Sequence, residues 1–276
     1  MYYQTEKAGE EEWKVGQRAI KEGLKVENLS KAAVQKIEKN IDLNIKGAVY
    51  YHSDAHTTPN EFMPQLKTYL KKNGVSIFGN EEVLDIDVKN DKIAAIKTTN
   101  LKIKADEFVI ATGSWSQNLA KKIGINIPVQ AGKGYRINTE KETGISIPAI
   151  LCEAKVAVTP MNGFTRFAGT MEIAGINQNI NKVRVETIAN AAKKYYPSIE
   201  LTQEEKNGAA SGLRPVSPDG LPYIGKSTKC ENLTIATGHA MMGWTMATAT
   251  GKLVSEITSE QKTSLEITNY HPDRKF

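Results

Sequence analysis

The pattern of apolar and polar positions predicts helices and strands in turn along the first part of this chain. Residues 6–40 carry apolar positions at helical spacing, which predicts two helices with a break near Gly23. A strand is predicted over residues 47–51. A helix should follow over residues 59–72, with Thr58 as its N-terminal cap and a proline in its first turn.

Beyond this helix the pattern changes to short strands. Apolar and acidic residues alternate over residues 83–88, a turn signal follows, and residues 93–98 have the pattern of a return strand, which together predict a hairpin. Residues 107–113 form an apolar run that ends at a glycine, as expected of a buried strand. Ser114 is placed to cap a helix over residues 115–123.

The second half alternates more regularly and predicts an antiparallel sheet followed by further helices. The predicted strands cover residues 129–138, 149–153, 156–160, 164–169, 209–213 and 232–236, and the predicted helices cover residues 180–196 and 243–259. Helices and strands mixed in this order predict an α/β (α+β) fold.

Composition narrows the functional classes. The 276 residues are enough for one large or two ordinary domains, and 36 basic against 31 acidic residues give a net charge of +5. The lysines lie in scattered pairs, so no basic stripe predicts nucleic-acid binding. Cys152 and Cys230 stand outside any metal-binding spacing, and no metal is expected. Without a signal-like or membrane-spanning run, we expect a cytoplasmic protein.

Arg214 is the first residue that indicates chemistry. It stands in Gly212-Leu213-Arg214-Pro215, and the proline restricts Arg214 to an extended backbone, so its side chain leaves a strand end in a defined direction. A guanidinium held in this way suits a bidentate contact with a carboxylate. A surface arginine in a loop is the alternative.

Two units of strand, glycine and helix are the second feature. One ends at Thr112-Gly113 and continues through Trp115, and the other ends at Thr237-Gly238, before a helix that starts at Gly243. Backbone N–H groups at such a helix start favour a negative group, so the two units are suited to one extended cofactor. Close packing of helix on strand through small residues is the alternative. No G-x-G-x-x-G fingerprint occurs in the chain.

These motifs together resemble the FAD-dependent D-amino-acid oxidase superfamily, most of all its bacterial D-amino-acid dehydrogenase branch, with glycine oxidase as a relative. The matching motifs are Asp54-Ala55-His56 with Pro59, Ala111-Thr112-Gly113-Ser114-Trp115-Ser116, Pro128-Val129 with Gly132-Lys133-Gly134-Tyr135, Gly169-Thr170-Met171-Glu172, Gly212-Leu213-Arg214-Pro215 with Pro218-Asp219-Gly220-Leu221-Pro222, and Ala236-Thr237-Gly238-His239 with Gly243-Trp244-Thr245-Met246-Ala247. At Thr58 the family commonly has an aspartate, so any role of that carboxylate is in doubt.

The resemblance implies roles for particular positions. Arg214 matches the arginine that holds the substrate carboxylate, and Tyr135, with Arg166, would face the substrate cavity. Val83 falls near the adenine, Thr112 and Gly113 fall near the pyrophosphate, and Trp115 is a further cofactor-binding position. The positions matching the loop and helix start beside the flavin ring are Gly238, His239, Met241, Met242, Gly243, Trp244 and Thr245. His239 is expected to act as a hydrogen-bonding residue of the loop rather than as a base.

The resemblance also implies a domain organisation. Residues 1–50 and 128–205 would form an antiparallel-sheet substrate domain, residues 51–127 and 206–260 an incomplete Rossmann-like FAD domain, and residues 261–276 a tail. The family's first strand, its G-x-G-x-x-G and its ribose-binding acidic residue are expected before residue 1. We therefore expect a truncated gene product or a fragment that by itself binds FAD weakly or not at all and is inactive.

The implied activity is FAD-dependent oxidation of a D-amino acid or related amine, giving an imino acid and then a 2-oxo acid and ammonia. Two alternatives stay open: a non-catalytic subunit or interaction domain of the same fold, and a sarcosine, proline or 2-hydroxy-acid oxidoreductase. The expected partner is a small-molecule amine or D-amino acid. A membrane quinone as acceptor, with the enzyme at the inner face of a membrane, and a homo-oligomer are further alternatives.

Overall fold

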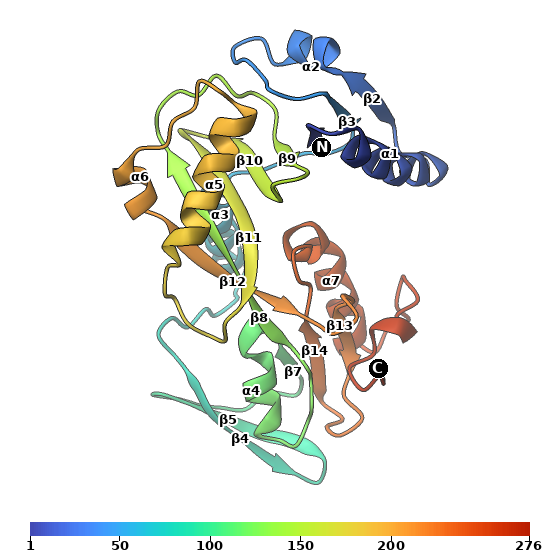
Figure 1. Cartoon of the computed structure of the whole chain (residues 1–276). Helices are drawn as coiled ribbons and strands as arrows, with labels where there is room; N and C mark the ends of the chain where they lie inside the picture. The colour runs from blue at the N-terminus through green and yellow to red at the C-terminus, as the bar shows by residue number, and fades with distance from the viewer. The chain divides into compact units, whose positions relative to one another are not determined.

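The computed structural model describes all of residues 1–276, and the chain divides into two compact units (Figure 1). Unit 1 comprises Met1–Val75, Gly134–Met171 and Gln178–Gly212, and unit 2 comprises Ser76–Lys133, Glu172–Asn177 and Leu213–Phe276. Residues 51–75 thus belong to unit 1, although the sequence led us to expect them in the FAD-binding part. The expected tail, residues 261–276, belongs to unit 2.

The largest sheet has eight strands in the order β12-β8-β11-β10-β9-β1-β3-β2. The strands are β1 (Tyr2–Tyr3), β2 (Val26–Ser30), β3 (Gly47–Tyr51), β8 (Gln130–Thr139), β9 (Ala149–Leu151), β10 (Val156–Met161), β11 (Phe164–Ile173) and β12 (Ala210–Val216). Their pairing is antiparallel from β9 to β11, as the alternating sequence predicted. Strands β8, β11 and β12 each cross the boundary between the two units.

The core of unit 1 lies between this sheet and helix α5 (Lys182–Tyr195), which crosses one of its faces in Figure 1. Tyr135 and Phe167 point from β8 and β11 into this core and are at most 1% exposed. Ile188 and Tyr195 of α5 belong to the same cluster. The other helices of unit 1 are α1 (Glu6–Lys21), α2 (Lys31–Ile37), α3 (Pro59–Lys72) and α6 (Gln203–Asn207).

Unit 2 contains two small sheets, with strand orders β13-β14-β7 and β4-β5-β6. The strands are β4 (Val83–Lys89), β5 (Lys92–Thr98), β6 (Lys102–Ile103), β7 (Phe108–Ile110), β13 (Tyr223–Lys226) and β14 (Leu233–Thr237). The helices are α4 (Ser116–Lys121), α7 (Gly243–Thr258) and the short turns η1 (Gly113–Trp115) and η2 (Thr268–Tyr270). No helix of the chain is long and apolar enough to cross a bilayer.

Neither predicted side-chain cap forms. Thr58 is the N-cap residue of α3, as predicted, and its carbonyl accepts from the Phe62 N–H, but its hydroxyl accepts a hydrogen bond from the Asn162 backbone N–H at 3.2 Å and makes no capping bond. Ser114 lies inside η1, where its hydroxyl is buried without a partner, and α4 begins only at Ser116. In both cases local geometry overrides the side-chain preference that the sequence shows.

Candidate functional site

Two glycine-containing loops of unit 2 lie at the same edge of its β13-β14-β7 sheet. Strand β14 runs parallel to β7, with Ile235 opposite Ile110, so the loops that follow the two strands emerge side by side. The Ser116 hydroxyl donates to Thr237 Oγ1 at 2.9 Å, and Thr237 Oγ1 donates to the Gly113 carbonyl at 3.2 Å. The predicted convergence of the two strand, glycine and helix units is therefore present.

Gly238 has a backbone that only glycine adopts readily. Its φ is +84°, and a Cβ atom there would lie 2.9 Å from Tyr223 Cδ2, closer than van der Waals contact allows. At Gly113, where φ is +55°, nothing lies within 4 Å of an added Cβ. The Gly238 loop is thus fixed by packing, whereas Gly113 borders open space.

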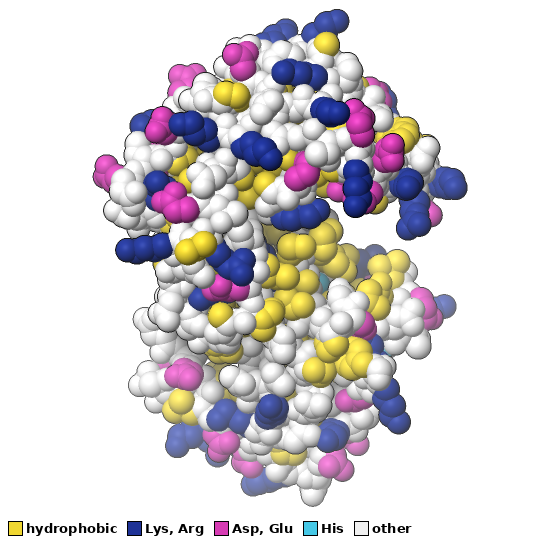
Figure 2. All heavy atoms as spheres, in the orientation of Figure 1, with side chains coloured by type: hydrophobic (Ala, Val, Ile, Leu, Met, Phe, Trp, Pro, Cys, Tyr) yellow, Lys and Arg dark blue, Asp and Glu magenta, His cyan; other side chains and the backbone are white.

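Helix α7 begins at Gly243 with no side chain capping its N-terminal N–H groups. Exposed apolar side chains flank this start: Met241 is 70% exposed, Met242 53% and Trp244 48%. Figure 2 shows hydrophobic side chains gathered where α7 lies in Figure 1. An uncapped helix start combines the positive end of the helix dipole with apolar contact area, which suits a flat aromatic group carrying negative charge.

The strand end that carries Arg214 lies against the Gly238 loop. Val216 and His239 form an antiparallel bridge, and the Ala240 N–H donates to the Pro215 carbonyl at 2.8 Å. The motif containing Arg214 and the glycine loop before α7, which are separate in sequence, are therefore neighbours in unit 2.

Arg214 has no partner for its charge. Its side chain is half-buried, its Nη1 atom is inaccessible to solvent and unbonded, and the guanidinium makes no ion pair or hydrogen bond. Burial lowers the pKa of Arg214, although an arginine remains charged at neutral pH. A half-buried unpaired cation is costly, and the carboxylate of a ligand would offset that cost.

His239 ties its loop to α7. Its Nε2 lies 2.9 Å from Thr250 Oγ1, and burial lowers the pKa of the ring, so His239 is neutral at pH 7. The ring is thus engaged in a structural hydrogen bond. This geometry agrees with a loop-positioning role rather than with a catalytic base.

The remaining predicted residues divide between this site and other parts of the fold. Val83 pairs with Thr98 in the β4-β5-β6 sheet, and Trp115 is 51% exposed in η1. Thr245 lies exposed in the first turn of α7. Tyr135 belongs to the core of unit 1, where it is 1% exposed. The roles implied for these positions stay predictions.

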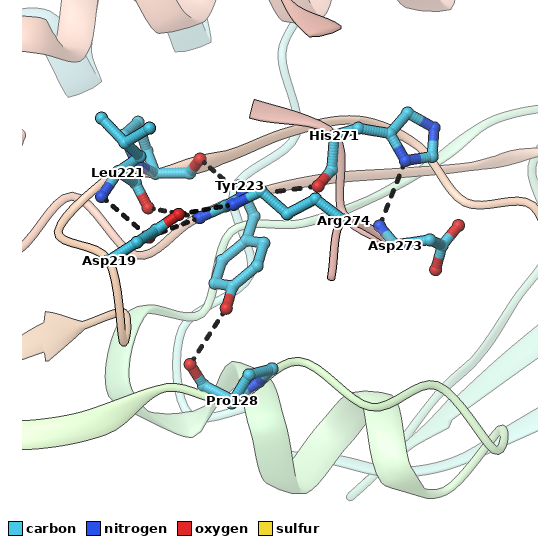
Figure 3. Close-up of polar contacts among 8 residues, drawn as sticks. Pro128, Asp219, Leu221, Tyr223, His271, Asp273 and Arg274 are labelled. Carbon is cyan, nitrogen blue, oxygen red and sulfur yellow. Dashed lines mark hydrogen bonds and ion pairs between the residues drawn. The ribbon is translucent and has the colours of Figure 1, made fainter. Parts of the chain in front are cut away.

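Sequence reasoning missed Arg274, which fastens the C-terminal segment to the loop after Arg214 (Figure 3). Arg274 Nε and Nη2 each lie 2.9 Å from an oxygen of Asp219, and Nη2 and Nη1 donate to the carbonyls of Leu221 and Pro222. The Arg274 guanidinium lowers the pKa of Asp219 to about 2. Asp219 belongs to a recognised motif, but no pattern indicated that its partner lies in the tail.

Tyr223 contacts both Arg274 and the Gly238 loop. The Arg274 guanidinium lies 4.0 Å from the centroid of the Tyr223 ring, and the Tyr223 hydroxyl donates to the Pro128 carbonyl at 3.2 Å (Figure 3). The same ring excludes any side chain at Gly238. Packing around Tyr223 therefore sets the loop that precedes α7.

Comparison with known proteins gives matches in sequence and in structure. Residues 1–257 match the family DAO, FAD dependent oxidoreductase. A D-amino acid dehydrogenase of Vibrio atlanticus (strain LGP32) is 35% identical over 219 residues, which cover 77% of this chain and 51% of that protein. A second, from Vibrio vulnificus (strain CMCP6), is 34% identical over 79% of this chain and 52% of its own length. The chain thus spans about half the length of these curated relatives.

A solved structure shares the fold. Glycine oxidase from Geobacillus kaustophilus superposes with a TM-score of 0.89 over 100% of this chain and 74% of that protein, at 22% identity. At that identity the likeness concerns the fold alone. It agrees with the mixed α/β architecture expected from the sequence.

Proposed function

We propose that this chain, which belongs to the FAD dependent oxidoreductase family, carries the flavin-facing and substrate-binding residues of an enzyme that oxidises D-amino acids or related amines. The observation that carries the proposal is the unpartnered, half-buried guanidinium of Arg214 beside the Gly238 loop. The name of the Vibrio relatives supports the substrate class.

The residues present fit the ring end of FAD. The uncapped start of α7 offers N–H groups to the ring edge that becomes negative on reduction, and Met241, Met242 and Trp244 offer apolar contact. The open space beside Gly113 admits a group close to the backbone. The sequence holds no G-x-G-x-x-G motif for the pyrophosphate. When bound, FAD supplies a hydride acceptor at its N5 atom.

Arg214 would orient the substrate. Two parallel hydrogen bonds from its guanidinium to the α-carboxylate fix the direction of the Cα–H bond, and partial burial of Arg214 strengthens the contact. Hydride loss from the neutral amine gives an imino acid, which water hydrolyses to a 2-oxo acid and ammonia. No protein base is needed for this step. The neutral, hydrogen-bonded state of His239 agrees with that requirement.

A non-catalytic role for the same fold is the competing function, and flavin reduction separates the two. The protein is mixed with FAD under anaerobic conditions, a panel of D-amino acids is added, and bleaching of the flavin absorbance is followed. The absent G-x-G-x-x-G motif predicts weak FAD binding, so FAD is supplied at saturating concentration; we then expect bleaching with the chain and bleaching about a hundredfold slower with Arg214→Leu. Arg18→Leu, which removes an exposed arginine from α1, should behave as the original chain.

Three results would contradict the proposal. If FAD is bound but no D-amino acid bleaches it, the oxidation of D-amino acids is refuted. If Arg214→Leu bleaches as fast as Arg18→Leu, the role of Arg214 is refuted. If no FAD is bound at saturating concentration, the competing non-catalytic role stands for this chain.

A further inference from the structure

The loop between strands β12 and β13 closes around Gly238. At its start, Val216 forms an antiparallel bridge with His239, the residue after Gly238. At its end, Tyr223 pairs with Thr237, the residue before Gly238. The distance between the two ends of this β12–β13 loop therefore sets the backbone on both sides of the glycine.

One side chain of the C-terminal segment holds the β12–β13 loop across its width (Figure 3). Arg274 Nε and Nη2 each lie 2.9 Å from an oxygen of Asp219. The same guanidinium donates to the carbonyls of Leu221 at 2.8 Å and Pro222 at 3.1 Å. It also lies 4.0 Å from the centroid of the Tyr223 ring. A planar group with this many contacts fixes the position of the whole loop.

The β12–β13 loop has little internal support of its own. Pro218 and Pro222 have no N–H to donate, and Gly220 has a left-handed backbone with φ +78°. The Gly220 N–H reaches the Ser217 carbonyl only at 3.4 Å. The contacts from Arg274 therefore supply most of the hydrogen bonds that hold the loop.

The C-terminal segment has anchors that do not involve the loop. The Thr228 N–H donates to Asp273 at 2.9 Å. Pro272 packs against Gly225, where an added Cβ atom would lie 3.0 Å from the proline Cδ. Because these contacts fix the segment to β13 and the turn after it, the Arg274 side chain reaches the loop from a separate support.

We infer that Arg274 is a positioning residue, which sets the direction of the Arg214 side chain and the conformation of the Gly238 loop. The β12–β13 loop begins directly after the strand end that carries Arg214, and the Tyr223 ring below Arg274 occupies the space beside Gly238. What Arg214 binds rests on the proposed function, whereas the contacts that hold the loop need neither FAD nor substrate. A displacement of about 1 Å in an orienting group can lower turnover about a hundredfold.

The first test uses the whole 276-residue chain without FAD. Amide hydrogen exchange is compared between the original chain, Arg274→Met and the control Asp273→Ala, which loosens the other anchor of the C-terminal segment. The Ala240 and Met242 N–H groups of the Gly238 loop should exchange about tenfold faster or more in Arg274→Met alone. Unchanged exchange in Arg274→Met, equal acceleration in Asp273→Ala, or acceleration spread over all of unit 2 would overturn the inference.

A kinetic test separates positioning from a general loss of structure. With saturating FAD, Arg274→Met should lower kcat/KM for a D-amino acid about fivefold more than for the amine that lacks the carboxylate, since only the acid engages Arg214. Arg274→Lys keeps a charge beside Asp219 but loses the planar set of contacts, so its loss should be smaller. An equal loss for both substrates would contradict the positioning of Arg214. If the original chain oxidises neither substrate, the proposed function fails, and hydrogen exchange alone decides the role of Arg274.

Discussion

Two arginines of unit 2 show opposite ways of using the same side chain. Arg274 donates to both oxygens of Asp219 and to backbone carbonyls, and it stacks on Tyr223. Arg214, only a few residues before Asp219 in the sequence, has no partner at all. The Arg274 guanidinium is paired within the chain and stabilises the fold, whereas the Arg214 guanidinium stays available for a ligand.

The comparison teaches that residue type and burial do not identify a binding arginine. Arg274 is 11% exposed and Arg214 is half-buried, and both belong to segments around the same loop. The two arginines differ in whether the chain places hydrogen-bond acceptors next to the guanidinium. An arginine without acceptors is costly to keep, and that cost indicates a function outside the fold.

The largest effect should follow from removing the free arginine. Arg214→Leu is expected to lower kcat/KM for D-amino acids by about a hundredfold or more, since a charge-assisted bidentate contact is worth about 3 kcal/mol. Its free energy of unfolding should not fall, because no hydrogen bond or ion pair within the chain is lost and leucine replaces the apolar stem of the side chain. Steady-state kinetics and urea unfolding measure the two effects. A stability loss as large as the kinetic loss would mean that Arg214 is structural.

Gly238→Ala probes the loop between the two arginines. The left-handed backbone costs a side chain about 1 to 2 kcal/mol, and the contact with Tyr223 adds to that, so we expect a loss of about 3 kcal/mol in unfolding free energy. Gly74→Ala is the matched control, because Gly74 has φ +85° but nothing within 4 Å. Equal losses in the two variants would show that Tyr223 does not constrain the loop.

Removing Arg274, the arginine that is paired within the chain, should have a smaller effect on stability. Arg274→Met removes the ion pair with Asp219, whose side chain is 31% exposed, so solvent screening limits the expected loss to about 1 to 2 kcal/mol. Chemical unfolding of Arg274→Met, Asp219→Asn and the double variant measures the coupling. Additive losses would show that the two residues do not interact.

Lowering the pH should weaken the ion pair between Arg274 and Asp219, with a still smaller effect on the free energy of unfolding. The pKa of Asp219 is about 2 in the fold against an ordinary value of 3.8, so its contribution is present above about pH 4 and is lost as pH falls towards 2. The original chain should lose about 1 kcal/mol more stability over this window than Arg274→Met does. Parallel pH profiles of the two proteins would refute the shift.

Glu153 in unit 1 also has a lowered pKa and also contributes to the pH dependence of stability. The effect of Asp219 must therefore be read from the difference between the original chain and Arg274→Met. Burial acts to raise the pKa of Glu153, but hydrogen bonds from Tyr195, the Gln4 N–H and Thr5 outweigh it and bring the value to about 2. This carboxylate titrates in the same window in both proteins. Only the difference between them reports on Asp219.

Long alternating or apolar segments were predictable from the sequence because their burial pattern is local. The strand over β8 and the helix α5 both appear near the expected residues, since one face of each enters the core of unit 1. The proximity of the Gly113 and Gly238 loops was also predictable. It follows from strands that end in Thr-Gly and lie parallel.

Features that depend on distant partners were not predictable. Strand β2 (Val26–Ser30) exists because it pairs with β3, and β13 because it pairs with β14, although neither has a strong alternating pattern. Arg274 gains its role from Asp219, which lies 55 residues earlier in the sequence. Contacts of this kind are decided by the tertiary structure and leave no local signal.

The most direct test compares a D-amino acid with the amine that lacks its carboxylate. For the original protein loaded with FAD, kcat/KM should favour the D-amino acid by about a hundredfold or more, because only that substrate engages Arg214. In Arg214→Leu this preference should fall to within about tenfold of unity. A preference that remains unchanged in the variant would contradict the account.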